Sequence, residues 1–330
     1  MQAQSRATGE HAAHSAVGET SAHTEQRGPT EEYIGIQMPR SNLLLVGAPA
    51  ALASAAVLAL SDVGTAVWIV QAVAVCLAFA IAWTGTRPIR RRGRPFPAGP
   101  IVGATLVALA TPLFVAATGP SRWLSLGPIS LYVAPVVLPT FLIACFAWLA
   151  MRGRSEYAAS AAVVVASLVL ALQPDASQAL ALFVGTATVA ARLRSKASIA
   201  AAAGSAVSGA WAFSQPDTLQ PLPHVEEVFA LALRHSLPTG IAVVACAAFL
   251  VIGLHRSAAR GRKWLAAVAT YYGVLFVCST AGLTPAPLVG YGAGPLLGFG
   301  LLVAAASWLD ETRDSSPEPT SLRDAAQSRC

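Results

Sequence analysis

Ten stretches of mostly apolar residues, separated by short polar segments, dominate the chain between residues 42 and 309. A helix needs roughly 20 apolar residues to cross a bilayer, and several of these stretches approach that length. Because backbone exposed to lipid must satisfy its own hydrogen bonds, such stretches are expected to be helical. The predicted spans are 42–60, 64–83, 99–118, 128–150, 157–172, 177–191, 197–213, 237–254, 264–282 and 291–309. We therefore predict an all-α, polytopic membrane protein with about ten transmembrane helices.

The composition supports this class. Of the 330 residues, 55% are hydrophobic and only 12% are charged, whereas a soluble domain carries about 25% charged residues. This balance excludes an ordinary soluble enzyme, a disordered chain and a nucleic-acid-binding domain, so no nucleic acid partner is expected.

The loops predict an orientation with both termini in the cytoplasm. Every second loop is basic, and four such loops together hold fourteen basic residues: Arg87, Arg90, Arg91, Arg92, Arg94, Arg152, Arg154, Arg192, Arg194, Lys196, Arg256, Arg260, Arg262 and Lys263. The opposite loops hold two, Arg122 and Arg234. Cytoplasmic loops carry the excess of Lys and Arg. The net charge of +6 is therefore read as a topology signal, and contact with anionic membrane lipids is expected.

Three regions follow from this pattern. Residues 1–40 are polar and are predicted to form a disordered cytoplasmic tail. Residues 41–309 form the ten-helix transmembrane domain, and residues 310–330 form a cytoplasmic C-terminal tail.

The polar residues that do not explain topology lie in the outer loops. They occur at Gly119–Gly127, Gln173–Asp175, 214–236 and Pro285–Gly294. Gly- and Pro-rich backbone at membrane depth is tolerated only inside protein or along a cavity. The pattern therefore indicates an outward-facing polar cavity with one or two carboxylates.

Each of these features also has a purely structural interpretation. Arg122 beside Trp123 is equally typical of an anchor at the membrane interface. Asp175 after Pro174 is equally typical of a helix N-cap. Glu226 and its neighbour are typical of a solvated acidic surface. These alternatives stay open from the residues alone.

In this order, the outer motifs resemble the SEDS family (shape, elongation, division and sporulation proteins, of the RodA/FtsW type). Gly119-Pro-Ser-Arg-Trp-Leu-Ser-Leu-Gly127 is similar to the family's G-A-x-R-W-I-x-L-G. Leu172-Gln-Pro-Asp175 is similar to its L-Q-P-D, and Pro223-His-Val-Glu-Glu-Val-Phe-Ala230 to its A-H-T-D-F-I-F-A. Gly282–Leu297 is similar to its G-L-x-P…L-P-F-x-S-Y-G-G-S-x-L. The resemblance covers roughly residues 42–309.

The resemblance implies a peptidoglycan glycosyltransferase that polymerises lipid II at the outer face of the bacterial cytoplasmic membrane, in cell wall synthesis linked to cell shape or division. Glu226 stands where the family has its key Asp, which implies a catalytic general base. Substrate-binding positions would be Arg122, Trp123, Asp175, His224 and Tyr291. A class B penicillin-binding transpeptidase is the partner that the resemblance implies. A divalent cation is a possible cofactor, although the sequence predicts no metal-binding residues.

A second hypothesis stays beside this one, because the chain departs from the family pattern. Glu226 replaces an Asp, and Arg234 and His235 stand where the family has a paired Glu. The alternative is a SEDS-fold membrane protein without catalytic activity that binds a polyprenyl-linked substrate or scaffolds cell-envelope assembly. A third reading, an unrelated transporter or channel, is disfavoured because no ionisable residue lies near the middle of any predicted span.

Overall fold

The computed structural model describes residues 42–61, 63–87, 95–115, 122–126, 129–151, 153–216 and 224–314. The predicted N-terminal tail, residues 1–40, lies outside the described residues. Of the predicted C-terminal tail, residues 310–330, the structure describes residues 310–314. The helices are α1 (Asn42–Leu60), α2 (Thr65–Thr86), α3 (Ala98–Val115), α4 (Ala134–Leu149), α5 (Arg154–Leu172), α6 (Ala176–Leu193), α7 (Lys196–Ser214), α8 (Val228–His235), α9 (Leu237–Ala259), α10 (Leu265–Thr280) and α11 (Ala293–Asp314). One antiparallel hairpin, β1 (Trp123–Leu126) and β2 (Ile129–Tyr132), precedes α4.

All ten predicted apolar stretches hold a helix, so the prediction of an all-α polytopic membrane protein is confirmed. Within the described residues, seven helices have the length and hydropathy of a membrane span: α1, α2, α3, α5, α6, α9 and α11. Helices α4 and α10 are apolar but have only 16 residues each, or about 24 Å of helix. The count of ten spans and the cytoplasmic placement of the termini stay predictions.

The structure differs from the predicted spans and loops at α4, α8, α9 and α11. Helix α9 extends to Ala259, beyond the predicted end of its span at residue 254. The span predicted to begin at residue 128 begins at Ala134, because residues 129–132 pair with β1 and Pro135 favours the start of the helix. The predicted loop 214–236 contains α8, an amphipathic helix with Val228, Phe229 and Ala232 on its buried face. Helix α11 continues to Asp314, beyond the predicted start of the C-terminal tail at residue 310.

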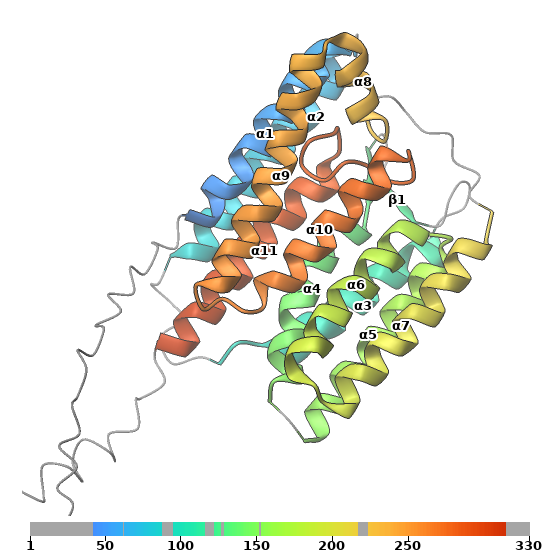
Figure 1. Cartoon of the computed structure of the whole chain (residues 1–330), viewed down its shortest axis with the longest axis vertical. Helices are drawn as coiled ribbons and strands as arrows, with labels where there is room; N and C mark the ends of the chain where they lie inside the picture. Colours follow the sequence, from blue (N-terminus) through green and yellow to red (C-terminus); the bar gives the residue numbers. More distant parts are fainter. Residues whose placement is uncertain are drawn as a thin grey trace, which may run out of the picture. The chain divides into compact units, whose positions relative to one another are not determined.

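Helix α2 packs along α11, and α1 packs along α9. Helices α5, α6 and α7 pack against one another (Figure 1). Helix α11 approaches its neighbours closely because it carries glycines on its packed face. A Cβ at Gly300 would lie 2.5 Å from the carbonyl oxygen of Ala78, and one at Gly298 would overlap the carbonyl oxygen of Pro135. Small residues at such contacts are typical of membrane helices.

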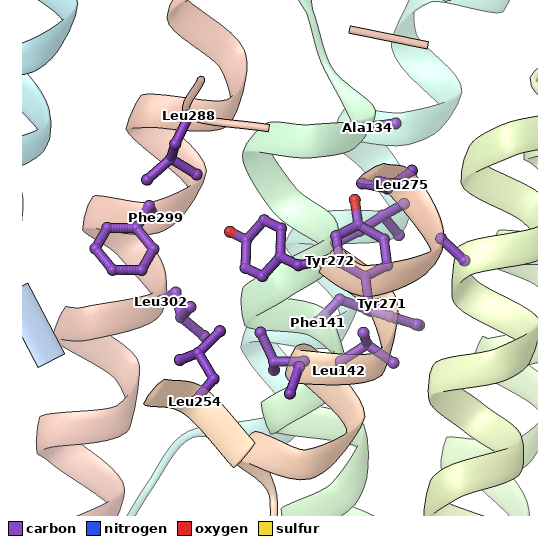
Figure 2. Close-up of a cluster of buried hydrophobic side chains, with 14 of the residues drawn as sticks. Ala134, Phe141, Leu142, Leu254, Tyr271, Tyr272, Leu275, Leu288, Phe299 and Leu302 are labelled. Atoms are coloured by element: carbon purple, nitrogen blue, oxygen red, sulfur yellow. The ribbon is translucent and has the colours of Figure 1, made fainter. Parts of the chain in front are cut away.

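The hydrophobic core draws buried residues from all the described helices, and its largest side chains include residues of α4, α10 and α11. Figure 2 shows two adjacent tyrosines of the core, Tyr271 and Tyr272, among aromatic and aliphatic side chains of α4, α10 and α11, together with Leu254 of α9 and Leu288. Phe141 of α4 and Leu302 of α11 are fully buried there. Large apolar residues elsewhere are exposed, such as Phe79, Leu77 and Val73 on α2. An apolar exterior around an apolar core is expected of a protein whose solvent is lipid.

Candidate functional site

The Gln-Pro-Asp connection between α5 and α6 forms a tight, buried turn. The Gln173 side chain donates to the carbonyl oxygen of Leu109 in α3. Asp175 then caps α6, since its carboxylate accepts from the backbone N–H of Gln178 at 3.3 Å. The N-cap interpretation of Asp175 is therefore confirmed.

Asp175 has a second set of contacts that a simple cap would not need. Its carboxylate also accepts a 2.6 Å hydrogen bond from the Tyr132 hydroxyl and one of 3.3 Å from the Ser177 hydroxyl. Burial raises the pKa of Asp175, while the charge of Arg122 and these hydrogen bonds oppose that rise. The residue is completely buried. Asp175 thus joins α6 to the hairpin through a buried carboxyl group.

The hairpin positions Arg122 and Trp123 inside the protein. The strand register pairs Trp123 with Tyr132, and their rings stack with centroids 5.1 Å apart. Arg122 directly precedes β1 and is only 8% exposed, and its charge acts on both Asp175 and Tyr132. An anchor at the membrane interface would expose its charge to headgroups, so this geometry favours a role inside the site. The remaining motif residues 119–121 and 127 lie outside the described part of the chain.

The polar contacts continue into the bundle from α6. The Gln178 side-chain carbonyl accepts a 2.6 Å hydrogen bond from the Tyr271 hydroxyl of α10. Both residues are buried, and a fully satisfied buried network rigidifies its surroundings. This contact fixes α10 against the N-terminus of α6, which Asp175 caps.

The segment of Glu226 forms a turn, residues 224–227, held by backbone hydrogen bonds. The carbonyl oxygen of Val225 accepts from the N–H of Ala286 at 3.2 Å, and that of His224 accepts from the N–H of Tyr291 at 3.0 Å. The Ser279 hydroxyl donates to the carbonyl oxygen of Glu226 at 3.1 Å. Glu226 itself is half-buried. Its backbone is therefore fixed on both sides by segments distant in sequence.

The two acidic residues of this turn have different surroundings. Glu227 forms a 2.9 Å ion pair with Arg234, whose side chain is 66% exposed. Such an exposed pair contributes little to stability. The solvated-surface interpretation thus fits Glu227, while the backbone carbonyl oxygen of Glu226 accepts a hydrogen bond from Ser279.

His224 and Tyr291 lie together, with ring centroids 5.9 Å apart. Burial lowers the pKa of His224, so its imidazole is neutral at pH 7. Burial raises the pKa of Tyr291. Both side chains are therefore uncharged hydrogen-bonding groups.

The last turn of α10 connects the two halves of the site. Ser279 bonds the Glu226 backbone, and the charge of Asp175 acts on the adjacent Cys278. The following segment, residues 281–292, bonds the turn of Glu226. A Cβ at Gly294, just beyond it, would lie 2.6 Å from the carbonyl oxygen of Tyr132. The four outer motifs, far apart in sequence, thus meet around one end of α10.

Several residues of this site were missed by sequence reasoning. Tyr132, Gln178 and Tyr271 lie in apolar stretches and belong to none of the motifs. A polar side chain within a predicted span was the available signal. Such a side chain indicates a polar partner on another helix.

The residues described by the structure hold no group of three or more His, Cys, Asp or Glu side chains that could bind a metal ion. A divalent cation as cofactor stays a prediction.

Comparison with solved structures identifies the fold. The chain is similar to two crystal structures of the rod shape determining protein RodA of Thermus thermophilus, one of the unmodified protein and one of a point mutant. Each has a TM-score of 0.63 at 22% identity, over 84% of this chain and 98% of that chain. No family model matches the sequence, and no curated protein matches it.

A third structure is described as the structural coordination of polymerization and crosslinking by a peptidoglycan synthase complex. One of its chains has a TM-score of 0.62 at 19% identity, with 84% of this chain and 98% of that chain covered. The chain therefore has the fold of RodA, and the resemblance to SEDS proteins is confirmed at the level of the fold.

Proposed function

We propose that this RodA-fold membrane protein is a SEDS-like peptidoglycan glycosyltransferase that polymerises lipid II. The observation that carries the proposal is the meeting of the four outer motifs at one end of α10. The turn of Glu226 accepts a hydrogen bond from Ser279 in its last turn, and the charge of Asp175 acts on the adjacent Cys278. A fold alone does not imply a function, so the proposal rests on this arrangement together with the fold.

Glu226 is the general base in this proposal. Among the acidic residues in the described outer motifs, Asp175 is completely buried, whereas Glu226 and Glu227 are half-buried. Glu226 is proposed as the base because it stands where the SEDS family has its key Asp. It accepts the proton of the acceptor sugar hydroxyl. The hydroxyl oxygen then bonds to the anomeric carbon of the donor as the bond to the polyprenyl diphosphate breaks. General-base assistance contributes about 10²–10⁴-fold.

The cluster of Arg122, Tyr132 and Asp175 supports the departing diphosphate. Charge develops on the diphosphate as the glycosidic bond breaks, and a preorganised cation stabilises it. Arg122 is the proposed cation, because it is buried and its charge acts on Asp175 and Tyr132. Asp175 is proposed to hold Arg122 and Tyr132 in place, because no surface of Asp175 is open to a ligand. Trp123, His224 and Tyr291 are proposed to contact the sugar or peptide.

The proposal places the chain in the cytoplasmic membrane of a bacterium, with its site at the outer face and a role in cell shape or division. A class B penicillin-binding transpeptidase is the proposed partner, because the third neighbour belongs to a peptidoglycan synthase complex. No step is assigned to a metal ion.

A lipid II polymerisation assay on the purified protein in nanodiscs tests this proposal. The wild type, with and without a candidate transpeptidase, is expected to make glycan strands, and Glu226→Gln is expected to make none. Strand formation by Glu226→Gln at the wild-type rate would exclude Glu226 as the base.

One observation favours the second candidate, a SEDS-fold protein without catalytic activity. The carboxylate beside Glu226 is bound by Arg234, where the family has a Glu. Such a protein would bind the polyprenyl-linked substrate or scaffold envelope assembly. Binding of lipid II without any strand formation by the wild type would support this candidate over the enzyme.

A further inference from the structure

Two buried polar side chains enter the site from α1 and α2, helices that carry none of the outer motifs. Ser54 of α1 is 1% exposed and Gln71 of α2 is 5% exposed. The buried residues of α2 are otherwise small and apolar, namely Ala74, Ala78, Ala82 and Gly85. Because a polar group in an apolar environment costs free energy unless it is bonded, the partners of these side chains matter.

The two side chains bond the backbone on both sides of Tyr291. The Ser54 hydroxyl donates to the carbonyl oxygen of Gly290 at 3.0 Å. The Gln71 amide donates to the Ser54 oxygen at 2.7 Å, and its carbonyl oxygen accepts from the N–H of Gly292 at 3.2 Å. These three bonds and the backbone from Gly290 to Gly292 form a closed ring that links α1, α2 and residues 290–292.

The ring continues into the turn of Glu226. The N–H of Tyr291, between the two bonded glycines, donates to the carbonyl oxygen of His224. A Cβ at Gly290 would lie 2.9 Å from the carbonyl oxygen of Val225. A displacement of residues 290–292 is therefore transmitted directly to the residues that precede Glu226.

We propose that Gln71 and Ser54 are positioning residues that hold residues 290–292, and through them the carboxylate of Glu226, in the geometry that the reaction needs. The inference rests on the proposed function for its catalytic part. Neither side chain is assigned a contact with substrate. Their effect is on the placement of the turn, and a displacement near 1 Å can lower a rate by about 10²-fold.

Hydrogen exchange of the intact protein in nanodiscs tests the holding role without any activity. Ser54→Ala and Gln71→Leu are expected to speed exchange of the Tyr291 and Gly292 amides by about tenfold, because each variant removes two of the three side-chain bonds of the ring. Ser167→Ala is the matched control: Ser167 is also buried and bonds across helices, to Ser205 at 3.0 Å, but in α5 and α7. It is expected to leave that exchange unchanged.

The holding role would be overturned if both variants left the hydrogen exchange of residues 290–292 unchanged. It would also be overturned if Ser167→Ala raised that exchange equally. If Gln71→Leu does not fold, Ser54→Ala carries the same test with a smaller change of volume.

Kinetics test the catalytic part. In lipid II polymerisation, Ser54→Ala and Gln71→Leu are expected to lower kcat by about tenfold or more, up to the 10²-fold range, with KM within about twofold. The double variant is expected to be no slower than the slower single variant, because both residues belong to one ring. Normal kcat with accelerated exchange would overturn the positioning role. A wild type without polymerase activity would instead refute the proposed function, and the exchange result would still decide the holding role.

Discussion

The Tyr132 hydroxyl donates a 2.6 Å hydrogen bond to the Asp175 carboxylate across 43 positions of sequence, and both residues are buried. This bond ties the hairpin before α4 to the start of α6. Because Arg122 directly precedes the hairpin and acts on the same carboxylate, the bond also determines where the positive charge of the site lies.

Removal of this bond is expected to destabilise the protein. Tyr132→Phe deletes only the hydroxyl and leaves the buried carboxylate with one partner fewer, at a cost of about 1–3 kcal/mol. Thermal unfolding in detergent measures the change. Tyr157→Phe, which alters an exposed tyrosine of α5, is the control and is expected to unfold like the wild type. An unchanged unfolding temperature for Tyr132→Phe would contradict the importance of the bond.

The raised pKa of Asp175 predicts a pH dependence of stability. Since the folded state holds the proton more tightly than the unfolded state, the contribution of Asp175 to stability is present at low pH. It is lost as the pH rises from about 4 through the raised pKa. Asp175→Asn keeps an N-cap residue and removes this titration.

The unfolding temperatures of the wild type and Asp175→Asn are compared from pH 4 to pH 7. As the pH rises, the unfolding temperature of the wild type is expected to fall relative to that of Asp175→Asn. Other carboxylates titrate in both proteins and cancel in the comparison. A difference that stays constant with pH would show that burial does not control the protonation of Asp175.

Gly290 is expected to be essential for the turn of Glu226. In Gly290→Ala the new methyl group meets the Val225 carbonyl oxygen at 2.9 Å and the Val228 side chain at 3.0 Å, so the turn has to move. Polymerisation is expected to fall by about 10²-fold. Gly103→Ala in α3 is the matched control, because nothing lies within 4 Å of the new methyl group. Equal activity of the two variants would place Glu226 outside the reaction.

Cysteine labelling tests the predicted orientation. In a cysteine-free background, Glu227→Cys is expected to react with a membrane-impermeant maleimide added to intact spheroplasts, and Lys196→Cys only after lysis. The two positions lie in loops of opposite predicted sides, and Lys196 is exposed while Glu227 is half-buried. Labelling of Lys196→Cys in intact spheroplasts would contradict the cytoplasmic placement of the N-terminus.

The helices were predictable because lipid imposes length and hydropathy on every span, and the ten apolar stretches all hold helices. The hairpin was missed because residues 129–132 are apolar enough to extend the span that follows them. Its strands are specified by pairing with residues 123–126, which is not visible in local hydropathy.

The candidate site was predictable only where its residues lie in loops. Asp175 and Glu226 stand out as charges beside apolar spans. Gln71 and Tyr271 lie within spans, and their importance comes from partners more than 90 positions away, Gly292 and Gln178. Long-range pairing of this kind depends on how the helices pack, which a single sequence does not show.

The most direct test of the central claim compares two neighbouring carboxylates in one assay. Lipid II polymerisation by the wild type, Glu226→Gln and Glu227→Gln is measured at matched protein amounts in nanodiscs. The account predicts glycan strands from the wild type and from Glu227→Gln, whose lost partner is the exposed Arg234, and none from Glu226→Gln. Formation of glycan strands by Glu226→Gln at the wild-type rate would contradict the account. Binding of lipid II by a wild type that forms no glycan strands would also contradict it.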